Sequence, residues 1–276
     1  MKPKMTAGRA LMYLILVIYA ALTLYPFLWM VAASFKPLRE IVSGSMQLLS
    51  GSMSFDNYRT IFGHTSLFPR WFFNSLMVST VGTVINVFIN SMAGYSLSRL
   101  HFPGRDHIHH ALLSLMMIPG QVLLIPNYLL MKNFGMLDTY ASLIIPAAAN
   151  IANIFLMRQF FINFPRDVEE AAEIDGLNRY GVFFRIAMPL ARPTIATTAI
   201  FGFMGFWNAF TAPMLYLKTP AKYTLTLGLQ AFKSHNGGTM WNEVMAAACI
   251  SVLPIIVIYL IFNRFFLVGL RMDGEK

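Results

Sequence analysis

Six long stretches of the chain contain no Asp, Glu, Lys or Arg. They cover residues 10–35, 71–98, 107–131, 139–157, 193–217 and 244–263. A helix of roughly 20 residues crosses the ~30 Å hydrocarbon core of a bilayer, and each stretch is about that long or longer. The pattern predicts an all-α integral membrane protein whose single domain, residues 1–276, contains six transmembrane helices. They are expected at about 10–33, 74–98, 108–131, 139–160, 193–217 and 244–266.

The composition agrees with a membrane protein. Hydrophobic residues make up 57% of the chain and charged residues 12%, against about 25% charged residues in soluble domains. This disfavours an ordinary soluble enzyme. The net charge of +9 does not indicate nucleic acid as a partner, because the basic residues are scattered between apolar stretches. Cys249 is the single cysteine, which excludes a disulfide framework.

The basic residues predict the orientation. Six spans place both termini on one side, which carries 13 of the 21 Lys and Arg residues, while the other side carries 8. By the positive-inside rule, both termini are cytoplasmic. The basic N-terminus resembles that of a signal peptide, but its apolar run exceeds the usual length of about 7 to 15 residues, so we expect a retained first helix.

One connecting segment, about 163–190, is more polar than the others. It follows the fourth predicted span on the cytoplasmic side and is unusually long for a connection. It holds five of the 12 acidic residues: Asp167, Glu169, Glu170, Glu173 and Asp175. We expect a partner outside the membrane to dock there; a solvated connector is the alternative.

Local signals predict two helices in this segment. Pro165 can open a helix over 166–175, acidic residues favour its first turns, and Gly176 can end it. Asn178 can cap a second helix that Pro189 closes. A narrow face of small residues flanked by acids suits insertion into a groove of the partner: Val168, Ala171 and Ala172.

The same segment resembles a known family. Glu170-Ala171-Ala172, Gly176, Ile186 and Met188-Pro189 match the EAA loop of ABC importer permeases, E-A-A-x3-G-x9-I-x-L-P. Met188 replaces Leu with a similar volume. The resemblance implies that a cytoplasmic ATPase pair grips this loop together with one from a second permease. It assigns coupling to Glu170, Ala171, Ala172 and Gly176, with Asp175 beside them.

Further runs are similar to carbohydrate-importing permeases of the maltose and multiple-sugar type, and the short first external loop and lack of extra N-terminal helices resemble the smaller of their two permease subunits. These runs are Tyr95 to Arg105, Ile125-Pro126, Asp138-Thr139, Phe206-Trp207-Asn208 and Lys222 to Leu225. The similarity implies a sugar cargo, an oligosaccharide in particular, and the cytoplasmic (inner) membrane of a bacterium or archaeon. The implied partners are a second permease subunit, two copies of an ATPase subunit and an external solute-binding protein. Arg271 to Gly274 departs from the family's ending, so no contact is assigned to this tail.

The chain lacks an energy source of its own. Its charge-free stretches lack the Asp, Glu, Lys or Arg that ion-coupled transporters usually place in their spans. The absence of a Gly-Lys dipeptide excludes a P-loop. We therefore expect a transport subunit without a cofactor or a metal, with ATP and Mg bound by the partner ATPase subunits. Four histidines lie near the cytoplasmic start of one predicted span: His101, His107, His109 and His110. No acid or Cys accompanies them at the spacing of metal ligands, so we expect their side chains to lie at the membrane interface.

The transport path is less clearly marked. Amides inside the spans can bind sugar hydroxyls or can join helices: Asn74, Asn86, Asn90, Asn127, Asn150, Asn153 and Asn208. We expect Asn208 and Trp207 to line the path, because they combine an amide with an aromatic face. Pro119-Gly120 and Pro126 are expected to break the third helix. The loop Ser234 to Thr239 can contact the solute-binding protein or serve as a flexible turn.

Two other functions remain open. A permease of the same mechanism could carry a glycerol phosphate or a polyol, although an anionic cargo would need cationic residues that the spans do not offer. A membrane-embedded enzyme would need convergent catalytic groups. Serines such as Ser91 and Ser114 lie in the spans without an acid or Lys beside them.

Overall fold

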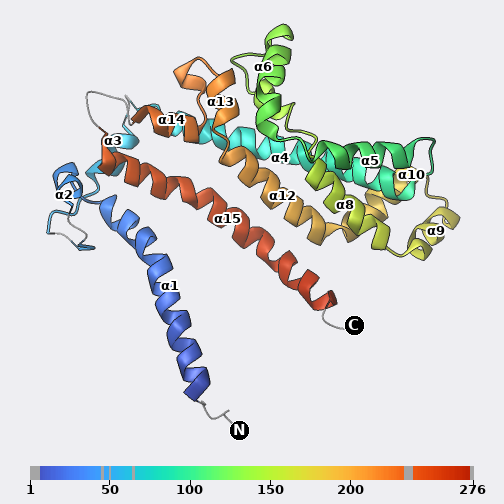
Figure 1. The fold of residues 1–276 in the computed structure, drawn as a ribbon, viewed down its shortest axis with the longest axis horizontal. Coiled ribbons are helices and arrows are strands. Elements are labelled where there is room, and N and C mark those ends of the chain that lie inside the picture. Colours follow the sequence, from blue (N-terminus) through green and yellow to red (C-terminus); the bar gives the residue numbers. More distant parts are fainter. Residues whose placement is uncertain (1–6, 45–46, 50, 64–65, 233–238, 274–276) are drawn as a thin grey trace. The chain divides into compact units, whose positions relative to one another are not determined.

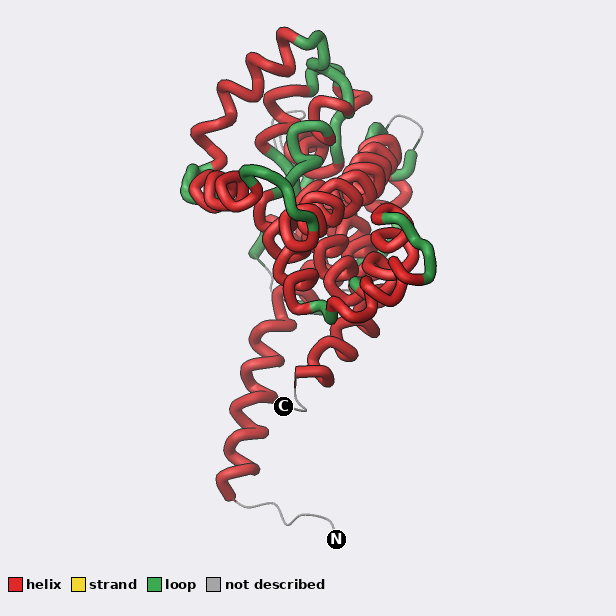
Figure 2. The backbone as a smooth tube through the Cα atoms, turned by 90° about the vertical axis from the view of Figure 1, so that its right-hand side faces the viewer, coloured by secondary structure: helices red, strands yellow, loops and turns green. Residues whose placement is uncertain are grey.

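The computed structural model describes residues 7–44, 47–49, 51–63, 66–232 and 239–273. Internal contacts divide the chain into two compact units, one formed by 1–69 with 229–253 and the other by 70–228 with 254–276. All regular structure in the described ranges is helical (Figure 1, Figure 2). The all-α prediction is confirmed for these ranges.

The first unit is held together by buried amides. Its helices are α1 (Ala7–Ala33), α2 (Leu38–Val42), α3 (Asp56–Ile61) and the start of α15 (Trp241–Asp273). Asn57 donates to the carbonyl oxygen of Ser34 at 2.8 Å, and Asn242 donates to Oδ1 of Asn57 at 2.7 Å. These bonds join the end of α1, α3 and the start of α15.

From α4 to α14 the chain lies mainly in the second unit, which α15 re-enters after Leu253. In chain order the elements are α4 (Phe68–Arg99), α5 (Arg105–Leu115), the 3-10 turn η1 (Gly120–Leu123), α6 (Leu124–Asn133), α7 (Ala141–Ile144), α8 (Ile151–Asn163), α9 (Arg166–Ile174), α10 (Arg179–Val182), the π-helix η2 (Phe183–Ala187), α11 (Met188–Leu190), α12 (Arg192–Trp207), α13 (Thr211–Tyr216), the 3-10 turn η3 (Pro220–Lys222) and α14 (Leu225–Phe232). One hydrophobic cluster of this unit centres on Phe206 and Tyr216, and another on Tyr95 and Met157.

Three helices in the described residues are long and apolar enough to cross a membrane: Gly8–Ala33, Phe68–Arg99 and Trp241–Phe262. The number rises to five if each of two bent pairs is one span. These pairs are α5 with η1–α6, bent by 98°, and the helical stretch α10–α11 with α12, bent by 79°. The predicted span at 139–160 instead consists of α7 and α8, separated by residues 145–150. The six-span arrangement stays a prediction.

Prolines have different effects at the two predicted breaks of the third span. Pro119 has a ψ of 129°, outside the helical range, and the break predicted at Pro119-Gly120 is confirmed by the bend. The break predicted at Pro126 is wrong, because α6 runs through it. Pro126 is the third residue of α6, where its missing N–H removes no bond within that helix.

Helices α4 and α8 approach closely at Gly94. A Cβ atom on this residue would lie 2.7 Å from Cβ of Met157 and 2.8 Å from the backbone nitrogen of Arg158. Only glycine leaves room for this contact. The C-terminal part of α4 therefore lies beside the middle of α8, and α9 follows α8 in the chain.

Candidate functional site

Helix α9 begins and ends within one residue of the predicted bounds. Pro165 precedes its first residue, and acids occupy its first turn, where the helix dipole favours them. It ends in a Schellman motif: the N–H of Leu177 donates to the carbonyl of Ala172, and the N–H of Gly176 donates to that of Glu173, both at 3.0 Å. Gly176 has a φ of +87°, where an L-residue is strained, so its predicted role in ending the helix is confirmed.

The predicted coupling residues lie on α9 and in the turn that follows it, and they differ in exposure. Glu170, Ala171, Asp175 and Gly176 are exposed, whereas Ala172 is 6% exposed. The helix packs against α10 and η2. The predicted small-residue face is therefore split, because Ala172 is buried within this chain.

The outer surface of this segment also carries apolar side chains that the sequence pattern did not single out. Ile174 is 86% exposed and Tyr180 is 74% exposed; Val168, which was predicted to belong to the small-residue face, is exposed as well. Large apolar side chains set among acids are typical of a surface that docks another protein.

The second helix of the segment starts at the predicted cap. Oδ1 of Asn178 accepts a hydrogen bond from the N–H of Gly181 at 2.8 Å. The helix continues through η2 and α11 to Leu190, so Pro189 lies inside its last turn, and the bend into α12 follows. Its buried Phe183 packs in the cluster that contains Tyr95 of α4.

Buried amides satisfy the backbone where α7 and α8 are separated. Nδ2 of Asn86 on α4 donates to the carbonyls of residues 147–148 at 2.9 and 3.2 Å, and its Oδ1 accepts from Asn153 at 2.9 Å. Oδ1 of Asn90 accepts from the N–H of Asn150 at 2.9 Å. Backbone groups of an interrupted helix need such partners where water is absent. For Asn86 and Asn90 the helix-joining role is therefore the one observed.

A cavity of about 440 Å³ lies beside this interruption. Its wall combines the amides of Asn86, Asn150 and Asn153 with the rings of Phe201 and Phe206. Thr224 also lines it; this residue is 1% exposed, and its hydroxyl has no hydrogen-bond partner among the described residues. No lining residue of the described chain is charged. The volume suits a small molecule, for which sites usually span about 300 to 1,000 Å³.

The two predicted path residues lie at the end of α12, between the cavity-lining Phe206 and Ala209. Asn208 is exposed. Trp207 is 3% exposed, and its ring packs against Phe203 at 5.6 Å and Phe72 at 5.7 Å between centroids. The indole is therefore covered in this structure, whereas the amide next to it is accessible.

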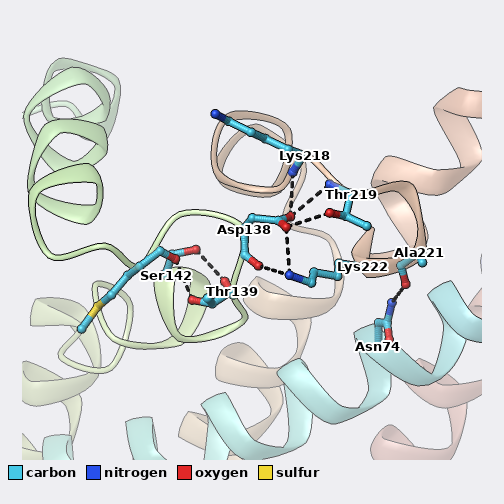
Figure 3. A network of polar contacts seen from close by, with 9 residues as sticks. Asn74, Asp138, Thr139, Ser142, Lys218, Thr219, Ala221 and Lys222 are labelled. Carbon is cyan, nitrogen blue, oxygen red and sulfur yellow. Dashed lines mark hydrogen bonds and ion pairs between the residues drawn. The ribbon is translucent and has the colours of Figure 1, made fainter.

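Asp138 joins two loops that are 80 residues apart in the sequence. Its carboxylate accepts hydrogen bonds from the N–H groups of Lys218 and Thr219, both at 3.0 Å, from the Thr219 hydroxyl at 2.7 Å and from Nζ of Lys222 at 2.8 Å (Figure 3). We call this group the Asp138 clasp. The Lys222 ammonium and then the backbone and hydroxyl donors hold the pKa of Asp138 well below its usual range. In the sequence, Asp138-Thr139 is noted only as a run similar to sugar permeases, and this run does not indicate the distant partners.

In the described part of the chain, no group of three or more His, Cys, Asp or Glu is placed to hold a metal ion. The ring of His109 stacks on Phe155, with 6.4 Å between centroids. Residues 234–238 of the predicted docking loop lie outside the described residues.

The sequence is similar to membrane components of transport systems. The sequence model of the family described as "binding-protein-dependent transport system inner membrane component" matches residues 90–271. The arabinooligosaccharides transport system permease protein AraQ of Bacillus subtilis (strain 168) is 32% identical over 276 residues, covering 99% of this chain and 98% of AraQ. The matched range includes all of α9.

Solved structures share the fold. A chain of a bacterial ABC transporter involved in the import of the acidic polysaccharide alginate matches with a TM-score of 0.85 at 25% identity, over 96% of this chain and 100% of that one. A chain of a bacterial alginate ABC transporter in complex with alginate pentasaccharide-bound periplasmic protein matches with a TM-score of 0.64 at 16% identity, over 92% of each chain. The second likeness concerns the fold alone.

Proposed function

The chain belongs to the family of binding-protein-dependent transport system inner membrane components, and we propose that it is the membrane subunit of an ATP-driven sugar importer. As a permease subunit of this family it has no ATPase site of its own. The observation that carries the proposal is the shape of α9, a short helix that exposes Glu170 and Ala171 and ends at Gly176 with a φ of +87°. This is the form that a rigid docking helix needs.

The proposed topology has six spans in one domain, with both termini and the segment 163–190 in the cytoplasm of a bacterial or archaeal cell. The bias of basic residues supports this orientation. In this arrangement each bent pair, α5 with α6 and α10–α11 with α12, contributes one span. Helices α7 and α8 form one interrupted span, and Asn86 and Asn90 bond to the backbone at the interruption.

Coupling is proposed to run through the outer surface of α9. Glu170, Ala171, Asp175 and Gly176 would contact a cytoplasmic ATPase subunit, and the buried Ala172 would hold the helix in place from the other side. Two copies of that ATPase subunit would bind ATP and Mg, one against this chain and one against a second permease subunit. An external solute-binding protein would deliver the cargo, by analogy with the alginate transporter of the same fold, which forms a complex with an alginate pentasaccharide-bound periplasmic protein.

The cargo is proposed to be a neutral oligosaccharide. AraQ is named for arabinooligosaccharides, and the cavity offers amides, a free hydroxyl and aromatic rings without a charged side chain. Such a wall suits sugar hydroxyls, whereas a uronate polymer or a glycerol phosphate would favour Arg or Lys. Asn208, which is exposed and adjoins the cavity-lining Ala209 in the chain, is proposed to contact the cargo, with Trp207 supporting its position.

The test is a reconstituted transporter carrying Glu170→Lys in this chain. The reversed charge should release the ATPase subunit and abolish uptake, while the membrane abundance of the chain stays normal, because Glu170 is exposed. Retention of the ATPase subunit and of full uptake would refute the proposed coupling. Uptake of sugar by the chain alone under a proton gradient would refute the ATP-driven mechanism.

A further inference from the structure

A buried ion pair joins α9 to the end of α4. Nε of Arg99, the last residue of α4, lies 3.5 Å from Oε2 of Glu169 on α9. The two side chains are only 6% and 13% exposed. Glu169 is the immediate neighbour of Glu170, and Glu170 is exposed.

Arg99 also holds the chain just before α9. Its guanidinium donates a hydrogen bond to the carbonyl oxygen of Phe164, and its Cζ lies 5.6 Å from the centre of the Phe164 ring. Phe164 directly follows the last residue of α8, and Pro165 separates it from α9. One side chain on α4 therefore fixes both sides of the α8–α9 corner.

Burial outweighs the favourable charge and donor around Glu169, so the net effect is a raised pKa. Burial raises the pKa of its carboxyl group, and the Arg99 charge and the hydroxyl of Tyr95 oppose that change. Oε1 of Glu169 and Nε of Arg99 have no hydrogen-bond partner among the described residues. A buried pair with unsatisfied atoms contributes little net stability, because desolvation offsets the attraction. Its geometric effect, fixing the position of α9, is therefore the more important one.

Helix α4 leads from this pair into the interior of the second unit. Gly94 packs on α8, and Asn90 and Asn86 hold the interruption between α7 and α8. Asn86 also lines the 440 Å³ cavity. At about 1.5 Å per residue, Arg99 and Asn86 are about 20 Å apart along one continuous helix. A displacement of α9 at Arg99 can thus reach the cavity through a single rigid element.

We propose that Arg99 and Glu169 are positioning residues that form a strut between α9 and α4, through which movement of the docked ATPase reaches the cavity wall. This inference rests on the proposed function. In this proposal Glu170 faces the ATPase partner and Glu169 faces α4. Docking of the ATPase and transmission of its movement to α4 therefore use neighbouring residues. Loss of the strut leaves a helix that still docks but no longer moves α4.

The experiment uses the complete transporter with Arg99→Gln or Glu169→Gln in this chain. The readouts are ATPase subunit co-purification, ATP hydrolysis with cargo-loaded binding protein, and sugar taken up per ATP. We expect the ATPase subunit to stay bound and uptake per ATP to fall about 5-fold or more, the usual range of coupling between sites. Asp106→Asn is the matched control, since it breaks the pair between Arg105 and an Asp106 side chain that is 68% exposed; its uptake per ATP should match the unchanged protein.

A double variant, Arg99→Met with Glu169→Leu, separates positioning from simple folding. Apolar side chains of similar volume can keep the two helices packed without unpaired charge. We expect the double variant to exceed both single variants in uptake per ATP. Unchanged uptake per ATP in both single variants, or a double variant no better than either, would overturn the strut.

The Glu170→Lys variant distinguishes the two proposals. If it releases the ATPase subunit while the Arg99 and Glu169 variants behave as the unchanged protein, only the strut is refuted. If Glu170→Lys keeps the ATPase subunit and full uptake, the proposed docking surface is refuted instead.

Discussion

Glu169 and Glu170 are adjacent on α9, yet the Glu169 side chain is 13% exposed beside Arg99 and Glu170 is exposed to solvent. Successive residues of an α-helix are about 100° apart around its axis, so neighbours can lie on different faces. One glutamate can therefore serve the fold while the next remains accessible to a partner. Substitutions at the two positions should separate internal transmission from docking.

The turn after α9 gives a first prediction. Gly176 has a φ of +87°, and an added Cβ would meet no atom within 4 Å, so the cost of substitution lies in the backbone alone. An L-residue pays about 1 to 2 kcal/mol there, and a β-branched one is placed worse. Gly176→Val should leave membrane abundance normal but reduce ATPase subunit co-purification and uptake.

Gly176→Asn is the matched comparison, because Asn adopts the left-handed conformation more readily. It should retain most of the uptake, and Gly176→Ala should fall between Asn and Val. Equal uptake in all three variants at equal abundance would contradict a role for this backbone conformation.

The contact of α4 with α8 gives a second prediction. A Cβ on Gly94 would lie 2.7 Å from Cβ of Met157, within two packed helices that cannot easily separate. Overpacking of this kind costs about 1 to 3 kcal/mol. Gly94→Ala should therefore lower the thermal stability and abundance of the protein. Gly205→Ala in α12 is the control, since its Cβ has open space and alanine favours a helix; its stability should not fall.

The interior amides and Asn208 give a third, paired prediction. Asn86→Leu removes three hydrogen bonds and leaves two carbonyls of the α7–α8 interruption without these partners. At an average of about 0.6 kcal/mol for a bond between membrane helices, the loss approaches 2 kcal/mol. Abundance should fall with uptake.

Asn208→Leu should keep abundance and basal ATP hydrolysis but lower uptake, and loss of assembly in that variant would assign Asn208 to packing.

The sequence predicted α9 well because its signals are local. Pro165, the acids of the first turn and Gly176 act within a single helix, and Asn178 caps the next one three residues before its bonded N–H. The interruption between α7 and α8 was missed for the opposite reason. Residues 139–157 read as one apolar span, and the partners of the carbonyls at the interruption lie about 60 residues away on α4.

The strut was also beyond the sequence pattern. Five acids in the segment 163–190 look equivalent in sequence, and only the direction of α9 toward Arg99 distinguishes Glu169. A helical wheel relates Glu169 to the small Ala172 three residues later, and both face inward. The three-residue spacing shows that Glu169 and Ala172 share a face of α9. Only the position of α4 shows that this face is the buried one.

The Asp138 clasp gives the last prediction, on pH. Asp138 accepts from Lys222, Thr219 and the N–H of Lys218, and these donors hold its pKa well below the usual value of about 3.9. A carboxylate with a lowered folded-state pKa stabilises the protein above its ordinary pKa, and the contribution is lost as the pH falls through the folded-state value. The clasp should thus be unchanged between pH 7 and pH 5, and weaken only below about pH 4.

Hydrogen exchange at the Lys218 and Thr219 amides measures this directly, because both N–H groups donate to Oδ1 of Asp138 at 3.0 Å. Their protection, corrected for intrinsic exchange rates, should be equal at pH 7 and pH 5 in the unchanged protein and clearly lower at both values in Asp138→Ala. Asp56→Asn is the control: its side chain is 70% exposed in a pair with Arg59, and its loss should not alter protection at these amides. Protection that fell between pH 7 and pH 5 would mean that the carboxyl group titrates in that range, and the donors around Asp138 would then not stabilise its charge as the geometry requires.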